Sequence, residues 1–222
     1  MKKDTALVTG GSRGIGKAIV NSLRDTGYTV YCPGREELDL SSNTSIEKFC
    51  KDFDQPLNAL VNNAGINIIN SFEEVSSEEI DQTFQVNLYS TMLLTKGLLK
   101  NFEKGVTGRM VNISSIWSAV AKEKRAIYAA TKSAINSLTR SLALELSPYN
   151  ILVNAVAPGY TATELTYKNN SENAIKNIEK LIPLGRLADP GEIASVVKFL
   201  LSAENTYMTG QTIIVDGGYT IQ

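Results

Sequence analysis

The chain of 222 residues has no histidine, two cysteines and no long apolar run. Without histidine, Cys32 and Cys50 cannot build a structural zinc site, and two cysteines are too few for a disulfide framework, so we expect no metal. The 22 Lys and Arg nearly balance the 23 Asp and Glu without forming a basic block, which argues against nucleic acid or an anionic membrane as partner. No segment approaches the roughly 18 apolar residues of a membrane span, and residues 1–11 lack the apolar run of a signal peptide. We therefore expect a cytoplasmic protein.

What the sequence does contain is an alternation of short apolar segments with segments of helical periodicity. The predicted strands lie at 5–11, 28–32, 58–65, 108–114, 150–159 and 211–218. The predicted helices lie at 15–27, 44–53, 76–104 with a break, 126–147, 172–181 and 190–202. Near-continuous apolar strands that alternate with helices are typical of a parallel sheet covered on both faces. The sequence thus predicts an α/β fold, a single doubly wound domain over residues 1–222.

One connection is too short for this pattern. Only residues 33–37 separate the second predicted strand from the acidic turn Leu-Asp-Leu-Ser-Ser at 38–42. A parallel crossover needs a dozen or more residues, so a helix is missing here. We expect the third strand, at 38–42, to be very short or poorly paired, and the pocket edge beside it to be more open than usual.

A glycine-rich turn, Thr-Gly-Gly-Ser-Arg-Gly-Ile-Gly at 9–16, stands where the first strand gives way to the first helix. Glycines let the backbone turn tightly and approach a pyrophosphate, whose charge is stabilised by amides at a helix N-terminus. The spacing is Gly-x-x-x-Gly-x-Gly, not the Gly-x-Gly-x-x-Gly of the general dinucleotide fingerprint. An ordinary tight turn is the alternative.

Tyr128 and Lys132 are four residues apart in a predicted helix, so they share one face. A free phenol has a pKa of about 10, but a nearby ammonium favours its anion and brings it toward the pH at which acid/base catalysis works best. The alternative is an amphipathic helix with a packed tyrosine and a surface lysine.

Together these motifs resemble the classical short-chain dehydrogenase/reductase family, over about residues 5–218. Further motifs that carry the resemblance are Asn-Asn-Ala-Gly (62–65), Asn87, the serines of Val-Asn-Ile-Ser-Ser (111–115), Pro-Gly-Tyr-Thr-Ala-Thr (158–163), Pro-Leu-Gly-Arg (183–186) and 209–218. The resemblance implies a Rossmann-type fold and an oxidoreductase. It is strongest to 3-oxoacyl-carrier-protein reductases, although cations that would dock an acidic carrier are few here. A non-catalytic dinucleotide sensor on the same fold is the alternative.

By resemblance, the catalytic residues are Asn87, Ser115, Tyr128 and Lys132. Ser115, thirteen residues before Tyr128, matches the serine that binds the substrate oxygen, with Ser114 as the competing position. Asn87 matches the asparagine that orders a proton-relay water, but it could equally cap or kink its helix. Tyr128 exchanges the hydroxyl proton, and Lys132 holds the nicotinamide ribose while lowering the tyrosine pKa.

The residues expected to bind the cofactor are Gly10, Ser12, Arg13, Gly14, Ile15, Gly16, Arg35, Asp39, Asn62, Ala64, Gly65, Tyr128, Lys132, Pro158, Gly159, Thr161 and Thr163. Arg35 follows a glycine where NAD-preferring relatives carry aspartate, and Arg13 could clamp the same 2′-phosphate, so NADP(H) is favoured. NAD(H) stays open because Glu36 or Glu37 could turn toward the ribose. Asn62 could instead form a structural hydrogen bond, and Thr163 could belong to a plain polar turn.

The segment at about 163–188 matches the variable substrate lid of the family. Expected pocket walls are Asn67, Ile68, Ile116 and Trp117, although Trp117 could be plain packing. The expected substrate is a small-molecule carbonyl or alcohol. The resemblance also implies a homotetramer or homodimer, formed through the long helices at about 87–104 and 126–147 and through the C-terminal strand. Exposed apolar faces on those helices would need such a partner.

Overall fold

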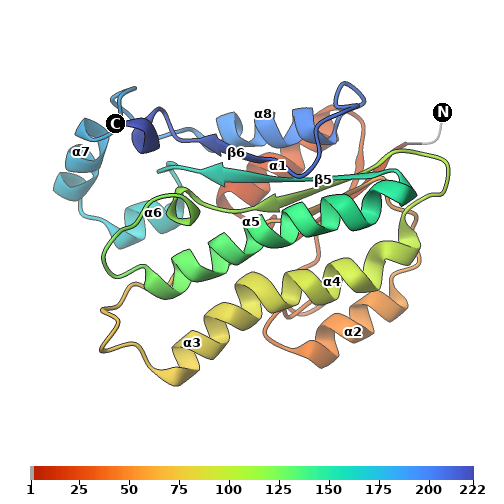
Figure 1. The fold of residues 1–222 in the computed structure, drawn as a ribbon, viewed down its shortest axis with the longest axis horizontal. Helices are drawn as coiled ribbons and strands as arrows, with labels where there is room; N and C mark the ends of the chain where they lie inside the picture. The colour runs from red at the N-terminus through yellow and green to blue at the C-terminus, as the bar shows by residue number, and fades with distance from the viewer. Residues whose placement is uncertain (1–2) are drawn as a thin grey trace.

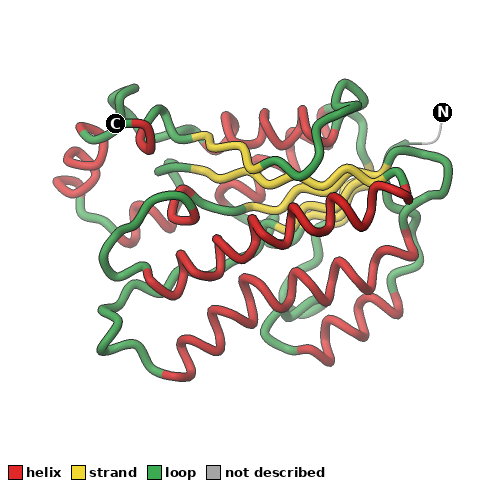
Figure 2. Tube along the Cα trace, in the orientation of Figure 1, coloured by secondary structure: helices red, strands yellow, loops and turns green. Residues whose placement is uncertain are grey.

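The computed structural model describes residues 3–222. Residues 1 and 2, which belong to the segment 1–11 considered above for a signal peptide, lie outside the described residues. One parallel sheet forms the centre of this described part, with strand order β2-β1-β3-β4-β5-β6 (Figures 1 and 2). The strands are β1 (Thr5–Val8), β2 (Thr29–Tyr31), β3 (Ala59–Asn62), β4 (Gly108–Ile113), β5 (Ile151–Pro158) and β6 (Thr212–Val215). All six expected apolar segments therefore contain a strand, somewhat shorter than predicted.

Helices cover both faces of the sheet, which confirms the doubly wound α/β prediction (Figure 1). The α-helices are α1 (Gly14–Asp25), α2 (Asn43–Asp52), α3 (Ser77–Phe84), α4 (Ser90–Leu98), α5 (Ala126–Leu146), α6 (Glu164–Asn169), α7 (Glu172–Lys180) and α8 (Pro190–Leu201). Helices α1 and α8 pack together over one face, while α2, α4 and α5 cover the other (Figure 1). The sheet side chains alternate between the two resulting apolar cores.

Local sequence signals explain where several helices begin. Ser76 and Glu79 form a capping box at the start of α3, since each side chain accepts a hydrogen bond from the other residue's backbone amide. Asp189 and Glu192 form the same box at α8, where Pro190 occupies the first turn. Within residues 3–222, no helix combines the length and apolar character that a membrane crossing requires.

The connection after β2 bears out the expected missing helix. Residues 32–42 form turns and irregular loop, with neither a helix nor a strand. The crossover helix and the strand expected at 38–42 are therefore both missing, and β2 forms the edge of the sheet. Leu38, 5% exposed, fixes this loop by inserting into the core beneath α2 and α4.

The expected break in 76–104 is a π-helical segment, Gln85–Tyr89, between α3 and α4. Such single π-helical turns often mark functional positions because they re-aim one side chain. Here Asn87 occupies the turn and is 1% exposed. The break therefore places a polar amide in the interior, close to the carboxyl ends of the strands.

Candidate functional site

Two adjoining cavities lie at the carboxyl ends of the strands. The first, about 510 Å³, is a cleft next to β1, where the strand order reverses, the usual ligand position in such sheets. The second, about 230 Å³, follows β4 and β5. Residues that line both cavities are Ile15, Asn63, Gly65, Ile66, Thr163 and Leu165. A ligand longer than either cavity could therefore extend from one into the other.

The glycine turn forms the floor of the first cleft. Gly10 and Gly14 have φ angles of +64° and +53°, which side-chain-bearing residues rarely adopt. A Cβ on Gly16 would lie 2.2 Å from the Gly10 carbonyl oxygen, so the turn closes too tightly for any side chain there. The expected residues that line this cleft are Gly10, Ser12, Arg13, Gly14, Ile15, Gly16, Arg35, Asp39, Ala64, Gly65 and Thr163.

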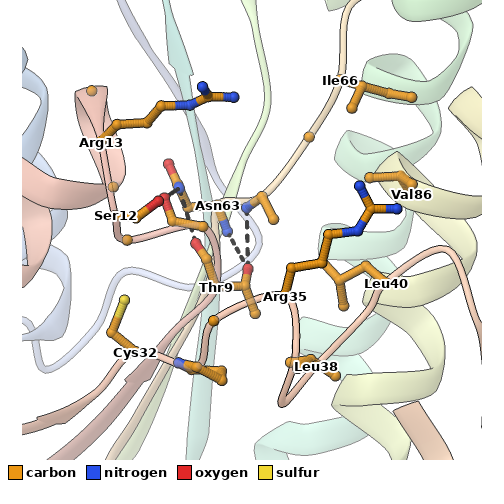
Figure 3. A pocket seen from close by; sticks show the side chains of 18 of the residues that line it. Thr9, Ser12, Arg13, Cys32, Arg35, Leu38, Leu40, Asn63, Ile66 and Val86 are labelled. Atoms are coloured by element: carbon orange, nitrogen blue, oxygen red, sulfur yellow. Dashed lines mark hydrogen bonds between the residues drawn. The ribbon is translucent and has the colours of Figure 1, made fainter. Parts of the chain in front are cut away.

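Asn63, which the sequence reasoning missed, holds the turn in place. Its Nδ2 donates to the carbonyl oxygens of Thr9 (2.9 Å) and Gly10 (3.1 Å), and the Thr9 hydroxyl accepts from the Asn63 and Ala64 amides (Figure 3). The preceding Asn62, expected to bind the cofactor, lines neither cavity. It is buried and donates to Asn112 Oδ1 (2.9 Å), so the alternative of a structural bond between β3 and β4 describes it. Two adjacent asparagines at the end of a strand could have indicated this division of roles, because successive residues of a strand point to opposite faces of the sheet.

Arg13 and Arg35 lie on opposite sides of the cleft, with Arg35 beside Leu40 and Val86 (Figure 3). Arg35 is largely exposed, and its Nε lies 3.5 Å from Asp39 Oδ2. Hydrogen bonds from Ser41, together with the Arg35 charge, keep the pKa of Asp39 below its usual value. Glu37, a possible ribose ligand by sequence, instead accepts from the Gly34 amide at 3.0 Å, and neither Glu36 nor Glu37 lines the cleft.

Ser115, Tyr128 and Lys132 all line the second cavity. Ser115 follows β4, and Tyr128 lies in the first turn of α5 with Lys132 one turn later. The Ser115 hydroxyl lies near enough to the Tyr128 phenol to lower its pKa, and Lys132 Nζ lies 5.6 Å from the centre of the Tyr128 ring. Lys132 Nζ also donates to the Ile113 carbonyl oxygen at 2.7 Å. Ser114, the competing serine, donates to the Lys132 carbonyl oxygen and thus supports the helix.

The pKa values in this cavity are set mainly by burial. Burial raises the pKa of Tyr128, while the Ser115 hydrogen bond and the Arg125 charge lower it. Burial also lowers the pKa of Lys132 to about 8. Arg125, a residue that the sequence reasoning did not single out, thus supplies a cation that lowers the pKa of the Tyr128 phenol.

Asn87 lies behind the cavities and joins three segments. Its Oδ1 accepts from the Ile66 amide (2.8 Å), and its Nδ2 donates to the Ile66 carbonyl oxygen (2.9 Å) and to Thr131 Oγ1 (3.2 Å). A Cβ on Gly65 would lie 3.2 Å from Asn87 Oδ1 and 3.6 Å from Lys132 Nζ. Asn87 therefore positions the loop that lines both cavities, and it lies next to the lysine.

The loop after β5 completes the second cavity. Pro158, Gly159, Thr161 and Thr163 all line it, as do the expected walls Asn67 and Trp117. Ile68 and Ile116 lie outside both cavities. Thr163 also caps α6 by accepting from the Thr166 amide, so its binding and turn interpretations are compatible.

The first cleft fits a dinucleotide. Gly10, Gly11 and Gly16 of the turn between β1 and α1 leave no room for a side chain, so a ligand can approach the backbone there. The amides at the start of α1 adjoin the cleft, and Arg13 and Arg35 lie on its two sides. The second cavity brings a phenol, a hydroxyl and an ammonium together next to that cleft. Such a set can orient a carbonyl oxygen and exchange a proton with it. Among residues 3–222, no group of three acidic or cysteine side chains could hold a metal ion.

Comparison with known proteins agrees with this geometry. The family model described as enoyl-(acyl carrier protein) reductase matches residues 36–220. The 3-oxoacyl-(acyl-carrier-protein) reductase FabG of Aquifex aeolicus is 37% identical, and the match covers 96% of each chain. The human L-xylulose reductase is 35% identical, again over 96% of each chain.

Solved structures give the same result. A short chain dehydrogenase family protein from Francisella tularensis has a TM-score of 0.91 and 35% identity, and the match covers 100% of both chains. An NADP complex of Pseudomonas aeruginosa RhlG has a TM-score of 0.91 at 30% identity, covering 98% of this chain and 96% of that one. The 3-ketoacyl-(acyl-carrier-protein) reductase of Brucella melitensis, complexed with NADH, has a TM-score of 0.87 at 28% identity, with 98% of each chain covered.

Proposed function

The chain belongs to the short-chain dehydrogenase/reductase family, whose members are oxidoreductases acting on alcohol or carbonyl groups, and on that premise we propose that it is an NADP(H)-dependent enzyme with Tyr128 as general acid/base. The observation that carries the proposal is that Ser115, Tyr128 and Lys132 line one cavity beside the glycine-turn cleft. A non-catalytic sensor would need the cleft but not these three side chains.

When bound, the nicotinamide supplies or accepts the hydride. Ser115 orients the substrate oxygen, since its hydroxyl lines the same cavity as the phenol that must share that oxygen. Tyr128 gives the proton to the oxygen in reduction and removes it in oxidation. Lys132 has its ammonium next to the Tyr128 ring and, by resemblance, holds the ribose. Asn87 fixes the backbone at Ile66, and we keep a water-ordering role for it as part of this proposal.

Tyr128→Phe tests the catalytic assignment. We expect turnover to fall by roughly 100-fold or more, since positioned acid/base catalysis contributes about that much, while cofactor affinity stays within about 2-fold. Tyr149→Phe is the matched control because Tyr149 is 71% exposed. Unchanged turnover of Tyr128→Phe would rule out the phenol as the proton carrier.

The preference for NADP(H) is supported by Arg13 and Arg35 on the two sides of the cleft. An arginine–phosphate bond is charge-assisted, so Arg13→Gln and Arg35→Gln should each weaken NADPH binding about 10-fold or more and change NADH binding little. Arg24→Gln, at the far end of α1, is the control. Titration by nicotinamide fluorescence gives both affinities. Tighter NADH binding by the wild type would overturn the NADP(H) proposal.

For the substrate, we propose a small carbonyl or secondary alcohol. The 230 Å³ cavity and the similarity to L-xylulose reductase support a small molecule. The similarity to FabG supports a 3-oxoacyl-carrier-protein as the alternative substrate. We further propose that residues 163–188 act as a lid on a single catalytic domain.

We also propose that the protein is cytoplasmic and forms a homotetramer or homodimer through α4 and α5. Tyr89 beside α4 and Leu144 on α5 support the assembly, since they are 44% and 79% exposed. Size-exclusion chromatography with light scattering tests it.

A further inference from the structure

The second cavity has a positive charge without an anionic partner, and the proposed reaction assigns it no contact with the substrate. Arg125 lines it three residues before Tyr128, and no aspartate or glutamate of residues 3–222 does. Arg125 Nη1 donates only to the Lys124 carbonyl oxygen (3.2 Å), and Nε is buried without a partner. Across the described chain the ion pairs involve other residues. A guanidinium held this way lacks the anion that its planar fork would bind.

A second cation, the exposed Lys122, lies outside the cavity lining but contacts two aromatic residues that line it. Lys122 Nζ donates to the Tyr160 hydroxyl (2.5 Å) and lies 5.1 Å and 5.6 Å from the ring centres of Tyr160 and Trp117. Those two rings and Tyr219 pack edge to face, with centres 5.6–6.0 Å apart, so the lysine rests on a rigid aromatic support. Partial burial and the Arg125 charge lower the pKa of Lys122. The two cations therefore repel each other, and an anion would relieve that repulsion.

The start of α5 adds to the positive electrostatic potential around Arg125. Arg125 is the N-cap of this 21-residue helix, and its side chain makes no capping hydrogen bond. No acidic residue occupies the first turn. The positive end of the helix dipole is thus left uncompensated, where a negative charge is favoured.

We propose that the substrate carries an anionic group, a carboxylate or a phosphate, near its reactive carbonyl, and that Arg125 binds this group with Lys122 beside it. The inference rests on the proposed function, since it assigns the substrate class of the same site. The cavity of about 230 Å³ limits such a substrate to a small molecule. A neutral acyl thioester would leave the Arg125 guanidinium without an anion.

Trp117, the only tryptophan of the chain, reports this site directly. Its fluorescence is followed with saturating NADP⁺, which cannot reduce a carbonyl, while two matched pairs are titrated: acetoacetate against acetoacetamide, and dihydroxyacetone phosphate against dihydroxyacetone. The anionic member of at least one pair should bind about 10-fold tighter or better, as charge-assisted bonds predict. The pair with the larger ratio identifies carboxylate or phosphate.

Arg125→Gln should abolish the preference, Arg125→Lys should keep part of it, and Lys122→Gln should reduce it. Lys124→Gln is the matched control, because it removes a charge from the same loop but lines a separate small cavity. Equal affinity of both members of each pair, no binding at all, or a preference that survives in Arg125→Gln would overturn the proposal.

Assays with NADPH separate this inference from the proposed function. Reduction of charged and neutral members with equal kcat/KM would retain the oxidoreductase and remove the anion site. Anion-selective binding without any reduction would retain the anion site and count against the proposed reductase activity. Preferred binding together with preferred reduction of the anionic member supports both.

Discussion

Replacing Asn87 by alanine tests whether this side chain acts mainly as a backbone clamp. The substitution removes three hydrogen bonds at a site that is 1% exposed, two of them to the Ile66 amide and carbonyl. Thr131 keeps its bond to the Tyr128 carbonyl oxygen, so the unpaired groups are those of Ile66. Each buried group left unpaired costs about 1–3 kcal/mol. Two such groups would cost about 2–6 kcal/mol, and because Ile66 is only half-buried we expect the free energy of unfolding to fall by the lower part of that range, about 2–4 kcal/mol.

The same change should weaken the cofactor site, because Gly65 and Ile66 line both cavities. Urea unfolding with and without NADPH measures both effects. Asn136→Ala is the matched control: on the partly buried face of α5, it loses one bond, to Ser118 Oγ, and should cost at most about 1 kcal/mol. Stability within about 0.5 kcal/mol of the wild type, with unchanged NADPH affinity and reduced turnover, would refute the clamp and leave a proton-relay role alone.

Two further predictions use the glycine turn and Lys132. Gly16→Ala should destabilise the fold by about 1–3 kcal/mol and weaken NADPH binding, because its Cβ would meet the Gly10 carbonyl oxygen at 2.2 Å and Asn63 Nδ2 at 2.4 Å. Gly34→Ala is the control: its Cβ would meet nothing within 4 Å, so the change should be neutral or slightly stabilising. Equal losses of stability for the two variants in thermal unfolding would contradict this prediction. Burial lowers the pKa of Lys132 from 10.5 to about 8, so the unfolded chain binds more protons between these values and stability rises with pH there, by about 3 kcal/mol. The free energy of unfolding of Lys132→Met should lack this rise, which urea unfolding at pH 7.5 and pH 10 measures. If wild type and variant differ in unfolding free energy by the same amount at both pH values, the lowered pKa of Lys132 is refuted.

The sequence predicted the sheet well because its strands are nearly continuous apolar runs between helical segments. Chain length alone predicted the missing helix, since residues 33–37 cannot form a crossover. It could not predict that residues 38–42 would form no strand at all. Burial of Leu38 decides this, because it fixes the loop in the core beneath α2 and α4.

For the site, the sequence was most informative where one helix or one turn sets the geometry. Tyr128 and Lys132 share a face because they are one turn apart, and the glycine turn is compact because its glycines leave no room for side chains. The Asn62 and Asn63 pair was harder to interpret, since strand alternation sends one to the cleft and one to the neighbouring strand, and the sequence does not say which.

The sequence alone could not place Arg125 in the second cavity, because some of its neighbours there come from a distant segment of the chain. Tyr128 is close in sequence, but Tyr160 follows β5. In the sequence, Arg125 stands in a run with Lys122 and Lys124 that looks like a solvated charged loop. The fold separates these cations: Lys124 lines a small cavity elsewhere, whereas Arg125 enters the catalytic cavity and acts on the phenol pKa. On our proposal, substrate selectivity depends on which cation of this short run turns inward, and tertiary packing decides that.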